Sequence, residues 1–469
     1  TIMGQSPESP AGTTGSAASE YCVPGDTNPC APPVAEWNFN ENSGLVLTDN
    51  SGNNHHGNLI NMTNSNWIKG PTSLGSALHF DGNNYVQAGS NMITGSSAFT
   101  LQGWFKAGSH SDFGLGVSIG NANTSQAAWL GWCGSANLGT SNSIGGGFYG
   151  RNYGSGITDN DWHFVSLTFS GGTNGTARLY VDGKVKTTDT YTPDLQATAI
   201  MFGKANTGTS YWYSGAIDNV KIYNYARSPA QIAWDYNRGA PVAHWRLDEC
   251  QGNVAHDASS NNLHGIININ SSGSQNALGT CTSGNATEAW YNGREGIFGS
   301  SLSFDGTDDY IDLGNGSGIR DFTDQITVSA WAKYNAYGGG GQSYSVIAVK
   351  GSPWTFLLEN YSRKIRFRVT VGGLDKNATD SQVHELNRWY HFVGTYDGAN
   401  IKIYKDGKLV GTTPATGNLA VNNVTAKIGT YQGTNYNFNG QIDDVRIYNY
   451  ALTQEQIKLL YNDNAAVRF

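Results

Sequence analysis

The chain has 469 residues, of which 38% are hydrophobic and 14% charged, and its formal net charge is −8 at pH 7. This length exceeds one ordinary core and suits two domains of about 200 residues each. The acidic balance, without a basic stripe, argues against nucleic acid and an anionic membrane as partners. No apolar run reaches the roughly 18 residues that span a bilayer, and we expect that a leader or anchor was removed or lies outside this sequence.

Residues 1–33 form an arm that is rich in Ser, Gly, Ala, Thr and Pro. Such a composition buries too little apolar surface to order a segment by itself, so we expect the arm to be disordered alone and, if the chain is a subunit of an assembly, to be ordered by docking onto a neighbour. A strand added to a sheet edge would pair the free backbone groups of that edge. The arm has few β-branched residues, however, so packing as an irregular ribbon is the alternative.

From Val34 onward one pattern occurs twice. The matching segments are 34–41 with 242–249, 75–82 with 299–306, and 215–240 with 440–465. A repeat of this length indicates duplicated domains and not a solenoid. We therefore expect a first domain at residues 34–238 and a second at residues 239–469.

Each copy predicts short strands that end in turns. Polarity is carried by Asn, Ser, Thr and 61 Gly residues, which favour turns and strands over helices. Residues 101–106 show partial strand alternation, and the Asp-Gly pairs at 182–183 and 406–407 predict hairpins. Ser228 and Thr453 each begin a capping box, which predicts one helix at the end of each copy. The sum is an all-β, two-sheet jelly-roll sandwich in each copy.

The cysteines predict two local disulfides. Cys22 and Cys30 lie close together in the arm, and Cys250 and Cys281 flank an insertion that only the second copy contains. Paired cysteines of this kind indicate an oxidising compartment. Cys133 is left over, and we expect it to be a small buried residue.

The repeated motifs occur in an order that resembles a known family. Trp-x-Phe-x-Glu, Ala-Leu-x-Phe-Asp-Gly, Trp-His-Phe-Val, Leu-Tyr-Val-Asp-Gly-Lys and Gly-x-Ile-Asp-x-Val-x-Ile-Tyr-Asn-Tyr-Ala follow one another from Val34 onward. This order is similar to the laminin-G-like jelly-roll family of the concanavalin A-like superfamily. The resemblance implies two tandem β-sandwiches, each closed by a short helix, in a secreted or cell-surface protein. It also implies glycan or protein binding and, commonly, a structural calcium ion.

Four aspartates are candidates for such an ion. Strand alternation places Asp218 and Asp443 on the apolar faces of their strands, where a carboxylate needs a cation or several hydrogen-bond donors. Asp49 and Asp257 lie in oxygen-rich loops, and Ca²⁺ prefers oxygen ligands. The resemblance pairs these regions, since the first and last strands of such sandwiches lie together. The alternative is that Asp218 and Asp443 accept backbone amides while Asp49 and Asp257 cap turns.

Exposed aromatic side chains are the candidates for sugar binding, because their faces can stack on pyranose rings. Adjacent aromatic residues cannot all face the core of one strand, so at least one of residues 211–213 should be exposed. The alternative is that these rings belong to the core and its rim. The candidates are Trp129, Trp132, Tyr211, Trp212 and Tyr213 in the first copy and, more weakly, Trp354 and Tyr431 in the second.

The sequence contains no Glu-x-Asp-x-Glu strand for glycoside hydrolysis and no Gly-x-Ser-x-Gly nucleophile motif. We therefore expect a non-catalytic protein outside the cell. Its tandem domains would serve adhesion to a glycan or a surface protein. The alternative is a structural subunit of an extracellular filament or surface layer, which self-associates through the arm.

Overall fold

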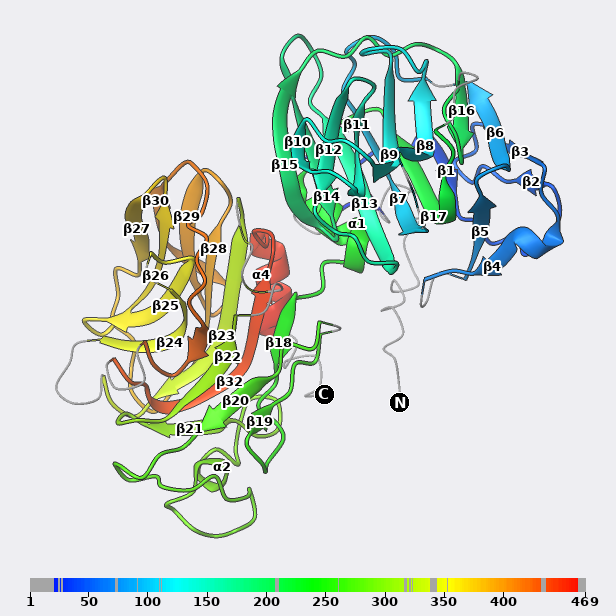
Figure 1. Ribbon diagram of the computed structural model, residues 1–469. Coiled ribbons are helices and arrows are strands. Elements are labelled where there is room, and N and C mark those ends of the chain that lie inside the picture. The colour runs from blue at the N-terminus through cyan, green and yellow to red at the C-terminus, as the bar shows by residue number, and fades with distance from the viewer. Residues whose placement is uncertain are drawn as a thin grey trace, which may run out of the picture. The chain divides into compact units, whose positions relative to one another are not determined.

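The computed structural model describes most of the chain between residues 21 and 462. Residues not described within that range are 24, 25, 27, 72–74, 91, 109, 111, 207–210, 260, 316–318, 320, 321, 323, 338–343, 352 and 432–435. The chain divides into two compact units between Tyr236 and Asn237. Each unit is a sandwich of two β-sheets (Figure 1), so the predicted all-β fold with two tandem jelly rolls is confirmed.

The first sheet of the first domain is antiparallel and contains the last strand of the domain at its centre. Its strands, in sheet order, are β15 (Lys184–Tyr191), β14 (Gly175–Val181), β13 (Trp162–Phe169), β7 (Phe99–Ala107), β17 (Ser214–Tyr223), β5 (Ser76–Asp81) and β4 (Trp67–Lys69), with β1 (Ala35–Trp37) paired to β17.

The second sheet of the first domain carries a parallel pair, β10 with β12, at one edge. Its strands are β10 (Leu138–Thr140), β12 (Arg151–Ser155), β11 (Ser143–Phe148), β9 (Ala127–Cys133), β8 (Gly114–Gly120), β16 (Ala199–Phe202), β6 (Tyr85–Ser90), β3 (Gly57–Ile60) and β2 (Val46–Leu47). A short 3₁₀ helix, η2 (Asn64–Asn66), precedes β4.

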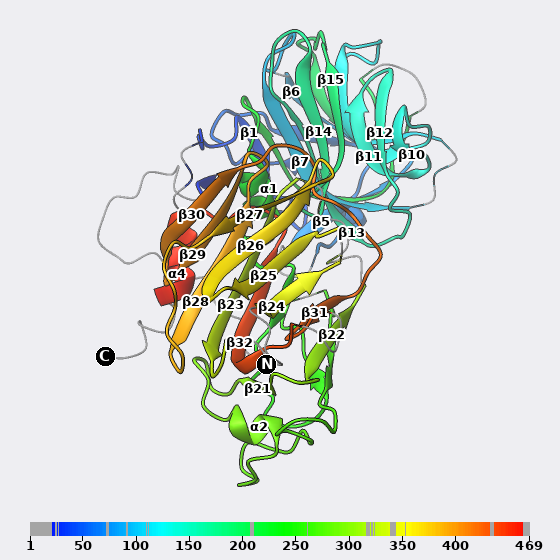
Figure 2. The same ribbon diagram turned by 90° about the vertical axis from the view of Figure 1, so that its left-hand side faces the viewer.

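The second domain repeats this plan, and Figure 2 looks onto its second sheet, with β25 and β26 in front of β23 and β28. Its first sheet contains β18 (Ala243–Trp245), β32 (Asn439–Tyr448), β23 (Ile326–Tyr334), β28 (Trp389–Tyr396), β29 (Asn400–Lys405) and β30 (Lys408–Pro414), with β21 (Leu302–Asp305) paired to β32. The second contains β19 (Val254–Ala255), β20 (Gly265–Asn268), β22 (Tyr310–Gly314), β31 (Ala426–Ile428), β24 (Tyr344–Lys350), β25 (Phe356–Tyr361), β26 (Lys364–Val371) and β27 (Leu374–Thr379).

Strand alternation separates core residues from those on the outer faces of the sheets. On β7, Leu101 and Phe105 belong to the core between the sheets, whereas Gln102 and Trp104 lie on the outer face. Each apolar side chain that is fully buried in this way stabilises the domain by about 1.5–3 kcal/mol.

A C-terminal helix covers part of the outer face of the first sheet in each domain. In the first domain this helix is α1 (Pro229–Asn237), and Tyr236 stacks on Trp104 with ring centroids 5.7 Å apart. In the second it is α4 (Gln454–Asn462), and Tyr461 stacks on Trp331 at 5.7 Å. The predicted capping boxes at Ser228 and Thr453 both form.

Residues 21–33 of the arm pack against the first domain itself. The guanidinium of Arg227 donates to the carbonyl of Tyr21 at 3.1 Å, and the amide of the Gln231 side chain donates to that of Pro29 at 2.8 Å. The hydroxyl of Tyr225 donates to the carbonyl of Ala31 at 3.0 Å. Docking of the arm onto a neighbouring subunit stays a prediction for residues 1–20, which lie outside the described residues.

Both predicted disulfides are present. Cys22 is bonded to Cys30, and Cys250 is bonded to Cys281 across a separation of 31 residues. Cys133 is a free, buried thiol, as expected. Within the described part of the chain, no helix is both long and apolar enough to cross a bilayer.

Candidate functional site

Aromatic side chains line a hollow on the outer face of the second sheet of the first domain. Alternation along β9 places Trp129 on this face, while Leu130 belongs to the core. Phe113 packs edge-on against Trp129 and against Tyr211, with ring centroids 5.8 and 5.7 Å apart. The cavity has a volume of about 170 Å³. This aromatic hollow is lined by Phe113, Leu115, Trp129, Tyr149, Gly150, Asn152 and Tyr211.

The hollow combines aromatic walls with the amide of Asn152 and the hydroxyls of Tyr149 and Tyr211. Trp129 is only 1% exposed and forms the floor, whereas Phe113, Tyr149 and Tyr211 are half-buried and form the walls. The amide of Asn152 provides hydrogen-bond donors and an acceptor beside the rings. A ligand with an apolar face and a polar rim suits this arrangement.

Three of the predicted sugar-binding residues of the first domain lie elsewhere. Tyr213 is fully buried in the core, and Trp132 lies on the core side of β9, where it stacks on His110 at 5.6 Å. Trp212 is half-buried outside the hollow and lies under the ammonium group of Lys204. The structure therefore brings together Trp129 and Tyr211 alone among the five candidates.

The corresponding face of the second domain also carries aromatic residues. Trp354 and Tyr431 contact each other with ring centroids 4.7 Å apart, and Tyr436 packs on Tyr431 at 6.1 Å. Trp354 is only 8% exposed and the guanidinium of Arg368 lies over its ring at 5.8 Å. Its ring is therefore covered by neighbours, as is that of Trp129.

Asp218 is completely buried, but the alternation from which its position was predicted is wrong. A β-bulge at Asn219, whose φ is 49°, shifts the register of β17. Asp218 consequently pairs with Trp104 on the outer face, while Val220 points into the core. Asp444 has a φ of 50° and makes the same bulge after Asp443.

Asp218 Oδ2 and the backbone carbonyls of Gly75 and Ser76 lie near one point beside Gly70, and the Gly75 carbonyl accepts the Gly70 amide at 2.9 Å. A Cβ atom on Gly70 would lie 2.8 Å from Asp218 Oδ2, 3.0 Å from the carbonyl of Ser76 and 3.1 Å from that of Gly75. No described residue donates a hydrogen bond of normal geometry to either oxygen of Asp218. Burial raises the pKa of Asp218 to about 8, against a smaller lowering effect of the Asn219 amide. A carboxylate among carbonyl oxygens fits the ligand preference of calcium.

Asp443 occupies the equivalent place with more hydrogen bonds. Its Oδ2 accepts from the amides of Ile297 and Phe298 at 2.6 and 3.1 Å, whereas its Oδ1 has no partner in the described residues. Burial raises the pKa of Asp443 to about 7, and these two amides oppose the rise. One oxygen of Asp443 thus remains available to a cation.

Asp49 and Asp257 are engaged in turns. Asp49 accepts backbone amides from Glu36, Ser51 and His55 at 2.8–3.0 Å, as well as the hydroxyl of Ser51. Asp257 accepts the equivalent hydrogen bonds in the second domain, from the amides of His244, Ser259 and Leu263 and the hydroxyl of Ser259. These bonds occupy both oxygens of each carboxylate, so the structure favours turn capping over metal binding at this pair.

A larger, polar cavity in the second domain was not predicted from the sequence. It has a volume of about 340 Å³ and lies where the insertion that only this domain contains meets the outer face of β21, β32 and β23. We call it the insertion pocket. Its lining residues are Ser274, Gln275, Asn292, Arg294, Glu295, Ser303, Phe304, Asp305, Lys333, Asn335, Asn439 and Gln441.

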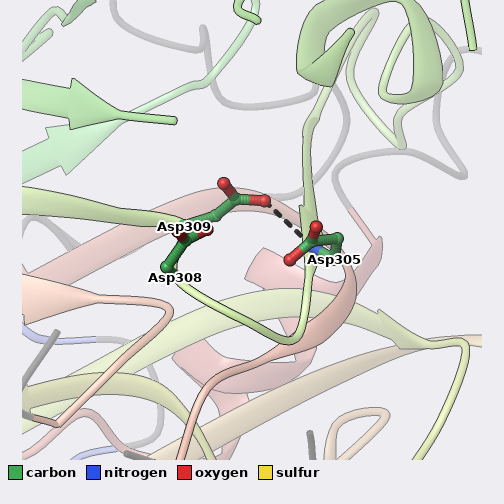
Figure 3. Close-up of side chains that lie close together, drawn as sticks. All are labelled: Asp305, Asp308 and Asp309. Atoms are coloured by element: carbon green, nitrogen blue, oxygen red, sulfur yellow. Dashed lines mark hydrogen bonds between the residues drawn. The ribbon is translucent and has the colours of Figure 1, made fainter. Parts of the chain in front are cut away.

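Three carboxylates meet in the turn between β21 and β22. Oxygens of Asp305, Asp308 and Asp309 lie within 4.8 Å of one another (Figure 3). Asp305 accepts the amide of Thr307 at 2.8 Å, and Asp309 accepts the amide of Asp305 at 3.0 Å. Asp308 accepts an amide from the insertion, that of Ser272, at 3.2 Å. Each carboxylate therefore caps part of the turn.

Asp309→Asn is expected to stabilise the second domain above neutral pH. Asp309 is 1% exposed, and burial raises its pKa to about 7. The folded state thus favours the protonated carboxyl, and this stability is complete below about pH 4 and is lost as the pH rises through about 7. Thermal unfolding between pH 4 and 8 should show a fall in the free energy of unfolding that is larger in the parent than in the variant by on the order of 1–3 kcal/mol, because Asp443, whose pKa is raised to about 7, titrates in both.

The first domain provides a natural control for this substitution. Asn84 holds the equivalent place, and its Oδ1 accepts the amide of Asp81 at 3.2 Å. An asparagine therefore fits this turn. A variant that lost stability at pH 8 would contradict the prediction.

Both domains match one family model. The model, described as the concanavalin A-like lectin/glucanases superfamily (Laminin_G_3), matches residues 80–233 and 305–458, which together exceed half of the chain. No curated protein sequence matches the chain.

Several solved structures are similar to parts of the chain. Domain 4 of AbnA, a GH43 extracellular arabinanase from Geobacillus stearothermophilus in complex with arabinotriose, is 18% identical with a TM-score of 0.34, over 43% of this chain and 97% of that one. Mouse laminin alpha1 domains LG4-5 are 12% identical with a TM-score of 0.27, over 80% and 91%. The botulinum neurotoxin serotype G binding domain is 14% identical with a TM-score of 0.36, over 48% and 51%. Similarities at this level carry no inference about function.

Proposed function

This chain belongs, in both of its domains, to the concanavalin A-like lectin/glucanase superfamily, and on that premise we propose that it is a non-catalytic extracellular protein that binds glycans. The two disulfides support a location outside the cell, because such bonds persist in oxidising compartments. Two domains in one chain would gain avidity on a surface that displays many copies of a glycan.

The aromatic hollow is the observation that carries the proposal. Its floor is Trp129 and its walls are Phe113, Tyr149 and Tyr211, with the polar side chain of Asn152 beside them. A sugar ring has an apolar face of C–H groups and a rim of hydroxyls, so it can pack on the rings while Asn152 bonds a hydroxyl. The hollow, of about 170 Å³, would accept one sugar ring.

Tyr211→Ala is expected to weaken glycan binding at least about tenfold, which corresponds to roughly 1.4 kcal/mol. Tyr211 is half-buried in a wall of the hollow, so its removal takes away stacking area without opening the core. The measurement is binding of the full chain to a glycan array, followed by titration of the best ligand.

Trp212→Ala is the matched control, because Trp212 is an adjacent, half-buried aromatic residue outside the hollow. It should leave affinity unchanged. Equal losses in the two variants, or no glycan bound by the parent, would count against the proposal.

A structural calcium ion in each domain is part of the same proposal. Asp218 would bind it with the carbonyl oxygens of Gly75 and Ser76, and Asp443 would bind it in the second domain. The ion would supply the positive charge that offsets a carboxylate buried in each place.

The alternative function, a filament or surface-layer subunit, depends on the arm. The described residues of the arm contact α1, the segment between β17 and α1, and β1 of the same domain, and residues 1–20 lie outside the described residues. Loss of self-association on deletion of residues 1–20, followed by analytical ultracentrifugation, would favour this function over glycan binding alone.

A further inference from the structure

We propose that the insertion pocket of the second domain is a separate binding site for a neutral saccharide residue, which it recognises through hydroxyl groups. The proposal rests on the proposed function only for the class of ligand. Its location differs from that of the aromatic hollow, as does its chemistry, which is polar where the hollow is apolar.

Hydrogen bonds within the walls hold the pocket in shape. The side chain of Gln275 donates to the carbonyl of Ser303 at 3.2 Å and accepts from the side chain of Asn292 at 3.0 Å. The side chain of Gln441 donates to the carbonyl of Asn292 at 2.6 Å. These bonds join the insertion to β21 and β32, so the walls are largely formed before a ligand arrives.

The disulfide adds a covalent restraint to the same wall. The amide of Cys281 donates to the carbonyl of Cys250 at 3.1 Å, and Gln251 bridges to Thr280 beside it. The helix α2 (Ala289–Asn292) follows this segment and ends at the pocket. The insertion is therefore held in place by the disulfide at Cys281 and by the hydrogen bonds at the pocket.

Polar groups that the fold does not use remain in the lining. Gln441 is 5% exposed, and its Oε1 accepts no hydrogen bond from the described residues. Lys333 pairs with Gln441 across β23 and β32, so the two side chains lie next to each other on one face. Within the described residues its ammonium group makes no hydrogen bond; it lies 5.4 Å from the centre of the Trp389 ring and interacts electrostatically with Glu295. A buried acceptor beside a donor is costly unless a ligand completes the pair.

Charge and chemistry favour a neutral, hydroxyl-bearing ligand. The lining contains two cations, Arg294 and Lys333, and two anions, Glu295 and Asp305, so its formal charges cancel. A carboxylate ligand would gain no net attraction from the lining, because the charges of Glu295 and Asp305 offset those of the two cations. A sugar hydroxyl both donates and accepts, so it can bond Gln441 Oε1 and the Lys333 ammonium at once.

The described residues on the equivalent face of the first domain differ from this site, although the strands are the same. Ala216 stands at the position of Gln441 and pairs with Lys106, the counterpart of Lys333. Lys106 is exposed, since the first domain has no disulfide-bonded insertion beside it. The lysine is therefore common to both scaffolds, whereas the glutamine and the insertion are special to the second domain.

Titration of the full chain with simple sugars tests the site. The parent for these measurements carries Tyr211→Ala, which weakens binding at the aromatic hollow, so that a failure at the insertion pocket can be distinguished from a failure of the proposed function. The probes are methyl α-galactoside, methyl β-glucoside and N-acetylglucosamine, with galacturonate as the charged comparison, and binding is measured by calorimetry and saturation-transfer NMR. We expect at least one neutral sugar to bind and galacturonate to bind more weakly.

Lys333→Met and Gln441→Ala should each weaken that binding at least about fivefold, or roughly 1 kcal/mol. Gln441→Ala introduces the residue that the first domain has at this position, so the fold should tolerate it. Lys106→Met is the matched control and should leave affinity unchanged. Tighter binding of galacturonate, no binding of any neutral probe, or equal affinity in all three variants would overturn the proposal.

Discussion

Removal of calcium with EGTA is expected to lower the melting temperature of the first domain by about 10 °C. If calcium is present at about 1,000 times its dissociation constant, binding contributes about 4 kcal/mol to the free energy of unfolding. For a domain of roughly 200 residues, each kcal/mol shifts the melting temperature by about 2–4 °C. The reason lies at Asp218, where a buried carboxylate has no donor of normal geometry in the described residues and the carbonyls of Gly75 and Ser76 lie nearby, beside Gly70.

Two substitutions distinguish an aspartate that binds the calcium ion from one that only stabilises a turn. Asp218→Asn should abolish the response of the first domain to EGTA, because the amide has no charge to attract the ion. Asp49→Asn should destabilise the domain to the same extent with and without EGTA, because Asp49 holds a turn through the amides of Glu36, Ser51 and His55. The assignment fails if Asp49→Asn removes the EGTA response and Asp218→Asn retains it.

Replacement of Cys250 and Cys281 by Ser is expected to cost the second domain about 3–4 kcal/mol. The bond closes a loop of 31 residues, and the entropy that it removes from the unfolded chain grows with loop length. Calorimetry of the full chain should show a lower unfolding temperature for the second domain and an unchanged one for the first. The insertion pocket should lose affinity for its sugar in parallel, because one wall is no longer restrained.

The disulfide of the arm is the matched control. Cys22 and Cys30 are separated by only 8 residues, so their replacement should cost about 1 kcal/mol less, and in the first domain. If the unfolding temperature of the second domain were unchanged in the Cys250→Ser, Cys281→Ser variant, the disulfide would not stabilise that domain and the prediction would be wrong.

The repeat, the sandwich fold, the terminal helices and the disulfides could be predicted from the sequence because each has a local signature. The orientation of Asp218 and Asp443 could not. Plain alternation assigns them to the core, but the bulges at Asn219 and Asp444 turn them outward, and those residue types at a strand position do not by themselves signal a bulge.

The candidate sites also include parts that the sequence could predict and parts that it could not. Trp129 and Trp132 are three residues apart on one strand, so alternation alone was enough to separate them. The insertion pocket depends on where a long loop meets a sheet, which no spacing rule provides. A signal was nevertheless present, because Gln441 replaces Ala216 within the best-conserved segment of the internal repeat.

The contacts of the arm with α1 also decide where the first domain can be cut. Arg227 is 2% exposed and bonds both Asp235 and the carbonyl of Tyr21, so a recombinant fragment that begins at Val34 would leave part of this ionic cluster open to water. Gln231 would lose the carbonyl of Pro29 at the same time. A fragment that retains the described contacts of the arm with α1 therefore begins at Tyr21 or earlier, at least thirteen residues before the start of the repeat.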